Sequence, residues 1–188
     1  MALQQTDYEK IRQVLYDIAY AQDTLDWQLF RRCWIQPELI DFDVAGHLDG
    51  YKVQKLPVKE LVRLSQEALG GFDCSQHVVT NITIASDEEA AAAGTAGAVN
   101  VRALITAFHY LDLARAEGVE SQSPVDGRSN EAIMRGVWKL KLVKNARGDW
   151  TIKSINVSRL APLTGNANLY SIAKKRFHDG LGRRPFTE

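Results

Sequence analysis

The stretch AGAVNVRALITAFHYLDL, residues 96–113, alternates in side-chain character along its length and contains no strand breaker. An alternation of period two is typical of a β-strand, in which successive side chains point to opposite faces. We therefore predict an unusually long strand here. One of its faces carries Val99, Val101, Ala103, Ile105, Ala107, His109 and Leu111.

More strands are predicted downstream of this stretch. Residues 114–130 are rich in Gly, Ser, Pro and charged side chains, which indicates a polar loop. The runs Ala132–Val143 and Trp150–Arg159 then flank the turn residues 144–149 and predict a hairpin. A last helix is predicted over Asn168–Phe177, with Leu169, Ile172, Ala173 and Phe177 on one face.

Upstream of the long strand, helical signals come first. Thr6 and Asp7 are good N-cap residues, and an apolar stripe with helical spacing follows them. Asp26 can cap a short second helix, Trp27–Trp34. The stripe of the first helix consists of Ile11, Val14, Leu15, Ile18 and Ala19.

A short strand is predicted over Leu39–Val44, and a third helix from about Pro57 to the pair Gly70-Gly71. The period then changes from helical to alternating. Val78, Ile82 and Ile84 alternate with polar residues and predict a strand that ends at an acidic turn, residues 87–89.

Helices thus come first and long strands later, which favours the α+β class. We expect one domain over residues 1–188, in which a strongly curved, cone-shaped antiparallel or mixed sheet wraps around the N-terminal helices. Such a cone has a single pocket at its open end.

The composition excludes several classes of function. The 188 residues are 45% hydrophobic, and 23 basic side chains balance 23 acidic ones. A net charge of zero disfavours binding to nucleic acids and to anionic membranes. Two cysteines, no apolar leader and no membrane-length apolar run favour a cytoplasmic protein. The four histidines, His47, His77, His109 and His178, lack HxH or HExxH spacing, so no metal is expected.

Three short motifs carry a resemblance to a known family. They are the run YAQDTLDW at residues 20–27, the run SQHVVTN at residues 75–81, and GDW at residues 148–150. In this order they resemble the SnoaL-like branch of the nuclear-transport-factor-2-like superfamily, and most of all scytalone dehydratase and related polyketide cyclases and isomerases. The resemblance covers about residues 5–160. The tail, about residues 161–188, is similar to the segment that closes the dehydratase pocket.

The resemblance implies cofactor-free acid–base chemistry on a small cyclic, polyketide-derived substrate. Asp23 matches the helix aspartate of the dehydratase pattern and His77 its first strand histidine. His109 lies on the strand of the second histidine, displaced by one or two positions. Gln22 stands where the dehydratases have a tyrosine, and residues 136–138 replace their serine and asparagine, so the specific dehydration does not follow from the resemblance.

Each candidate residue also has a structural interpretation. Asp23 can be a cap or a solvated carboxylate, and His109 a core histidine. His77 shares a strand face with Val79, Asn81 and Thr83, which is either a pocket wall or a polar surface. His47 is expected at the surface.

Tyr20, Tyr51, Asn81 and Trp138 are the candidates for substrate binding. Tyr51 matches a dehydratase tyrosine that helps to hold a water on the substrate oxygen. A tryptophan that alternates with polar residues on such a strand, as Trp138 does, is more often a core residue than a substrate platform.

Two classes of function remain: a cofactor-free lyase, isomerase or cyclase, and a non-catalytic small-molecule-binding or assembly module on the same fold. Convergence of Asp23, His77 and His109 in one apolar pocket favours the enzyme. We also expect the open face of the sheet, made partly apolar by Val78, Ile82 and Ile84, to be buried in a homodimer or higher homo-oligomer.

Overall fold

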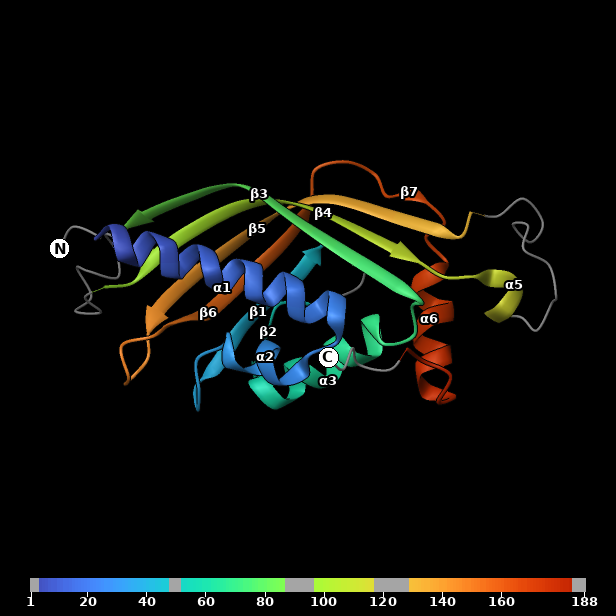
Figure 1. Ribbon diagram of the computed structural model, residues 1–188, viewed down its shortest axis with the longest axis horizontal. Helices are drawn as coiled ribbons and strands as arrows, with labels where there is room; N and C mark the ends of the chain where they lie inside the picture. The colour runs from blue at the N-terminus through green and yellow to red at the C-terminus, as the bar shows by residue number, and fades with distance from the viewer. Residues whose placement is uncertain (1–3, 48–51, 87–96, 117–128, 184–188) are drawn as a thin grey trace.

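A curved seven-stranded mixed sheet is the main layer of the protein (Figure 1). The computed structural model describes residues 4–47, 52–86, 97–116 and 129–183. The strands follow the order β2-β1-β6-β5-β4-β3, and β7 pairs with β5. β1 and β6 are parallel, and the other pairings are antiparallel. The predicted α+β class is confirmed. The strands are β1 Leu39–Gly46, β2 Gln54–Pro57, β3 Cys74–Ser86, β4 Val99–Tyr110, β5 Glu131–Lys144, β6 Trp150–Arg159 and β7 Thr164–Gly165.

The helices occupy the inner side of the sheet's curve and one of its ends (Figure 1). α1 runs along the inner side, and α6 stands at the end where β3 begins and β4 ends. None of the helices within the described ranges has the length and apolarity that crossing a membrane requires. The helices are α1 Gln5–Thr24, α2 Trp27–Arg32, α3 Val58–Leu69, α5 Leu113–Ala116 and α6 Leu169–His178.

α1 begins differently from the prediction. Its N-cap position is Gln4, which makes no side-chain cap, so the expected capping by Thr6 or Asp7 is wrong. The Asp7 carboxylate instead accepts a hydrogen bond from Trp150 Nε1 at 2.9 Å and pairs with Lys144 at 3.1 Å. These contacts tie the start of α1 to the β5–β6 hairpin. Asp26, by contrast, caps α2 as predicted, because its carboxylate accepts from the backbone amides of Gln28 and Leu29.

The alternation along β4 is confirmed, although the strand is shorter than the predicted 96–113. Every second residue from Val99 to His109 is buried and faces the helices. On the same inner side Ile11, Leu15 and Ile18 of α1 are buried in the main core. β2 was not predicted, because its four residues show no alternation long enough to signal a strand.

A β-bulge in β3 corrects the predicted faces of that strand. The register with β4 shifts between Thr80 and Thr83, and Asn81 takes the left-handed conformation with φ of 51°. The extra residue reverses the alternation beyond it. His77 and Val79 therefore face inward before the bulge, and Ile82 and Ile84 face inward after it. Val78 points outward and is 45% exposed, so the expectation that Val78, Ile82 and Ile84 share one open apolar face is wrong.

α6 closes the end of the fold by packing against the residues that follow α3. A Cβ at Gly71 would lie 1.7 Å from the carbonyl oxygen of Ala173, so only glycine permits this approach. The buried Arg176 of α6 donates hydrogen bonds to Gly71 O and to Asp73 Oδ1, each at 2.9 Å. A second small core lies beneath α6 and consists of Phe72, Leu111, Leu113, Ala132, Leu169 and Ala173.

Candidate active site

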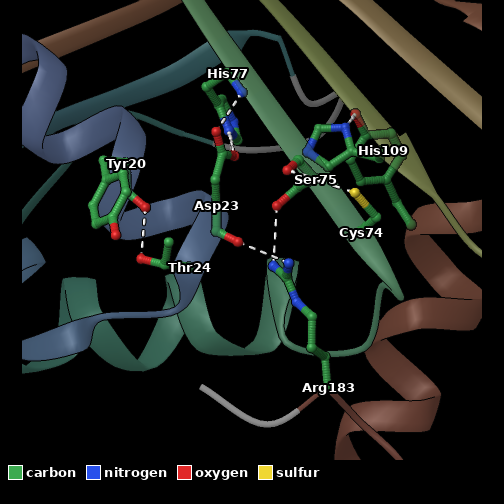
Figure 2. A network of polar contacts seen from close by, with 9 residues as sticks. Tyr20, Asp23, Thr24, Cys74, Ser75, His77, His109 and Arg183 are labelled. Atoms are coloured by element: carbon green, nitrogen blue, oxygen red, sulfur yellow. Dashed lines mark hydrogen bonds and ion pairs between the residues drawn. The ribbon is translucent and has the colours of Figure 1, made fainter. Parts of the chain in front are cut away.

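Asp23 and His77 form a hydrogen-bonded pair at the junction of α1 and β3 (Figure 2). Asp23 Oδ1 lies 2.6 Å from His77 Nδ1, and Asp23 Oδ2 accepts the backbone amide of His77 at 2.7 Å. One carboxylate thus fixes both the ring and the main chain of the same histidine. Because the carboxylate is an acceptor, Nδ1 carries the proton, and Nε2 is the ring nitrogen left for a substrate.

This geometry argues against the structural interpretation of Asp23 as a helix cap or a solvated carboxylate. The side chain is neither a helix cap nor a solvated carboxylate, because both of its oxygens bind His77. α1 ends one residue later at Thr24, and Leu25 turns the chain with φ of 59°. The last turn of α1 therefore places the carboxylate beside β3.

His109 lies next to this pair, with its ring centre 5.5 Å from that of His77 and the two rings nearly perpendicular. The residue is only 2% exposed, and its Nδ1 lies 3.1 Å from the hydroxyl of Tyr170 on α6. Burial, with smaller contributions from the neighbouring His77 and His47, lowers the pKa of His109 from 6.5 to about 3. Burial also raises the pKa of Tyr170 to about 12. Both groups are therefore neutral at neutral pH, and His109 is available as a hydrogen-bonding group rather than as a cation.

Tyr170 was missed by the sequence analysis. The predicted apolar face of the last helix does not include Tyr170, because the residue lies at the edge of that face. The docking of α6 turns this edge toward His109. The resemblance of the tail to a pocket-closing segment was the one signal that pointed to this region.

The two histidines and Tyr170 face one cavity of about 150 Å³. Its walls are mainly aromatic and aliphatic, and Trp138 lies beside His77 with ring centres 6.3 Å apart. Asp23 is not part of the wall but lies behind His77. Among the described residues, no Lys, Arg, Asp or Glu lines the cavity. The polar lining residues are Gln22, His47, Ser65, His77, His109 and Tyr170.

The remaining candidates have different outcomes. Tyr20 is 51% exposed and does not line the cavity, and Asn81 is exposed at the bulge, so the structure brings neither to the site. Tyr51 lies outside the described residues. His47, expected at the surface, lines the cavity instead, because the end of β1 brings it toward Tyr170 at 6.3 Å between ring centres.

The arrangement provides the parts of an acid–base site. A histidine can take and return a proton near neutral pH, and a carboxylate on its other nitrogen stabilises the charged ring. Neutral hydrogen-bonding groups nearby can stabilise an oxygen of the substrate. Within the described ranges, no group of three His, Cys, Asp or Glu side chains is placed to hold a metal ion.

Comparisons with known proteins agree with this fold. A family model described as a SnoaL-like domain matches residues 4–156. The chain matches no protein of curated function.

Solved structures with the same fold have low sequence identity to this chain. The Kfla4162 protein from Kribbella flavida has a TM-score of 0.70 at 18% identity, covering 90% of this chain and 98% of its own. A candidate scytalone dehydratase from Novosphingobium aromaticivorans has a TM-score of 0.61 at 16% identity, covering 85% and 87%. The hexachlorocyclohexane dehydrochlorinase LinA type 2 has a TM-score of 0.62 at 14% identity, covering 86% and 90%. At sequence identities this low, the similarity to these structures shows a shared fold and nothing further.

Proposed function

The chain belongs to the SnoaL-like domain family, and from this membership and its site geometry we propose that it is a cofactor-free acid–base enzyme. The reaction is of the lyase or isomerase type, which includes dehydration and cyclisation. The substrate is a small, uncharged cyclic ketone or alcohol of the kind that polyketide synthesis produces. One observation carries the proposal: Asp23 holds His77 by Nδ1, while the His77 ring faces an apolar cavity.

The proton transfer follows from this geometry. His77 Nε2 accepts a proton from a substrate carbon next to a carbonyl group, and the carboxylate of Asp23 stabilises the resulting imidazolium. In an elimination the carbon–oxygen bond then breaks, and the departing hydroxyl takes the proton back from the His77 imidazolium and leaves as water, which returns His77 to its neutral form. In an isomerisation His77 returns the proton to another carbon. We assign the hydrogen bond to the substrate oxygen to the neutral His109–Tyr170 pair, because His109 lies beside His77.

The cavity supports an uncharged substrate of one or two rings. An apolar cavity of about 150 Å³ can hold a benzene-sized molecule, and a two-ring substrate requires the wall side chains to move. No ionised Lys or Arg in the described wall could pair with a carboxylate or phosphate group. Two proteins of the same fold are named as a candidate scytalone dehydratase and a hexachlorocyclohexane dehydrochlorinase, and both names denote enzymes that catalyse eliminations.

Proton exchange tests this proposal. The protein is incubated in D₂O with a panel of uncharged one- and two-ring ketones, including 2-tetralone and cyclohexenone, and proton NMR follows the signal of the carbon next to the carbonyl. We expect at least one ketone to exchange faster with the native protein than with the His77→Ala variant. Ketones that bind, as judged by native mass spectrometry, but exchange at the rate of the buffer would instead support the non-catalytic binding module. Neither binding nor exchange anywhere in the panel would contradict the proposed substrate class.

A further inference from the structure

Arg183, near the end of the described chain, reaches both elements that carry the Asp23–His77 pair (Figure 2). Its Nη1 donates to the backbone carbonyl of Asp23 at 2.7 Å, and its Nη2 donates to Ser75 Oγ at 3.1 Å. Ser75 is buried and lies two residues before His77, on the same face of β3. One guanidinium therefore spans the end of α1 and the start of β3.

The carbonyl of Asp23 belongs to the last turn of α1, where carbonyl groups have no amide partner within the helix. Cationic side chains are favourable at this end of a helix, and α1 has no basic residue in its own last turn. Arg183 supplies that cation from 160 residues further along the chain.

The position of Arg183 is itself fixed by the backbone. Its amide donates to the carbonyl of Gly70 at 2.8 Å, just after α3. A Cβ at Gly182 would lie 2.5 Å from the same carbonyl oxygen, so a glycine allows the close approach. The guanidinium is half-buried, and its two acceptors are uncharged. A planar fork with two donors suits this bridge, whereas the single ammonium of lysine does not.

We propose that Arg183 is a positioning residue, which holds α1 and β3 at the separation that keeps Asp23 hydrogen-bonded to His77. The inference deepens the proposed function, since it concerns the same pair. Arg183 does not line the cavity and acts through Asp23 and Ser75. Loss of the bridge lets the carboxylate and the ring move apart by a fraction of an ångström.

The test compares Arg183→Gln and Arg183→Lys with Lys175→Gln, which removes one positive charge from an exposed position on α6. The first readout needs no substrate. The proton that His77 Nδ1 shares with Asp23 is observed by NMR as a downfield signal, assigned by its loss in Asp23→Asn. We expect both Arg183 variants to shift this signal upfield or broaden it, and Lys175→Gln to leave it unchanged. Ser75→Ala, which removes one acceptor, gives a smaller shift in the same direction.

The second readout is turnover of a ketone that the native protein exchanges. Small misplacement of reacting groups can cost up to about a hundredfold, so we expect kcat to fall about ten- to a hundredfold in both Arg183 variants. KM changes less, and the melting temperature falls by no more than about 4 °C. The Arg183→Lys variant keeps the positive charge but lacks the two-donor fork, so it separates the effect of the hydrogen-bond geometry from that of the charge.

The outcomes distinguish this inference from the proposed function. If the NMR signal and turnover of both Arg183 variants match those of Lys175→Gln, Arg183 has no positioning role, even when Asp23→Asn abolishes turnover. If the signal responds to Arg183 but Asp23→Asn leaves turnover unchanged, the positioning inference stands and the proposed chemistry fails.

Discussion

Asp23 differs from an ordinary surface carboxylate because both of its oxygens are used on one neighbouring residue. The ring and the backbone amide of His77 each occupy one oxygen, so rotation of the carboxylate would break two hydrogen bonds at once. The same residue therefore fixes the orientation of both carboxylate oxygens.

Replacement of His77 by alanine is expected to lower turnover by at least about a hundredfold, because a positioned proton-transfer group contributes about 10²–10⁴-fold. Asp23→Asn should cost nearly as much, since it removes the charge that stabilises the imidazolium. Asp17→Asn, a half-buried position on the same helix that does not line the cavity, is the control. Steady-state rates with an exchanging ketone check this. Near-native rates for both His77→Ala and Asp23→Asn would reduce these residues to structural polar groups.

The buried His109 predicts acid sensitivity. Its pKa is about 3 in the folded protein and about 6.5 in an unfolded chain, so below pH 6.5 the unfolded chain binds a proton that the folded protein excludes. The stabilising contribution is complete above pH 6.5 and is lost as the pH falls toward 3, at up to about 1.4 kcal/mol per pH unit. Urea unfolding at pH 7 and pH 5 measures this slope. The slope should be shallower in His109→Gln; an unchanged slope would mean that His109 titrates normally.

At the scale of single elements, the bulge in β3 depends on the left-handed backbone of Asn81. Asn81→Ala should destabilise the protein by about 1 kcal/mol, because a Cβ without a local polar partner disfavours this conformation. Asn81→Gly should keep the native stability or increase it slightly. Both variants should retain turnover, since the side chain points away from the cavity. Chemical denaturation provides the comparison, and equal losses in both variants would show that the side chain of Asn81, not its φ, matters.

The packing of α6 depends on the missing side chain of Gly71. A Cβ there would overlap the carbonyl of Ala173, so Gly71→Ala should destabilise the protein by about 3 kcal/mol and loosen α6. If the Gly71→Ala change speeds amide hydrogen exchange in α6 more than in α1, relative to the native protein, the loss of packing is located at α6. Ser171→Ala, an exposed change on α6, is the control. Native exchange rates in Gly71→Ala would contradict the close packing.

Features that depend on neighbouring residues in the sequence could be predicted, whereas features that depend on tertiary packing could not. β4 and the burial of His109 followed from alternation alone, and the Asp23–His77 pair followed from the family resemblance. The faces of β3 were wrong because one extra residue at Asn81 reverses the alternation, and nothing in the sequence marks that position as a bulge. Tyr170, His47 and Arg183 were missed as site residues because tertiary packing alone brings them there, Arg183 across 160 residues.

At the scale of the whole molecule, the residues on the outer face of the sheet are relevant to the predicted homodimer. The apolar reason given for an oligomer is weakened, because Ile82 and Ile84 face inward and, of the three residues, Val78 alone points outward. The outer face instead carries Arg102 and Lys139 on β4 and β5, and Asp41 and Asp43 on β1, around a hollow. A second copy turned by a twofold axis would bring the basic residues of one copy opposite Asp41 and Asp43 of the other.

We therefore still predict a homodimer, now through charge as well as the exposed Val78 and Leu104. Light scattering at micromolar concentration should give twice the chain mass of 21.0 kDa. Arg102→Glu should weaken the dimer, and a further Asp43→Arg change should restore it in part. A monomeric mass for the native protein would contradict the prediction.

The bulge in β3 has a consequence for how the cavity can be altered. In a regular strand His77 and Ile84, seven positions apart, would lie on opposite sides, yet both face inward here. The bulge thus divides β3 into two halves, and the alternation of inward and outward side chains in one half is independent of that in the other. The half before the bulge is locked by Asp23 through the His77 backbone. The half after it can lose or gain a pair of residues, or exchange its side chains, without turning His77 away from the cavity, so the shape of the wall and the position of His77 can diversify separately.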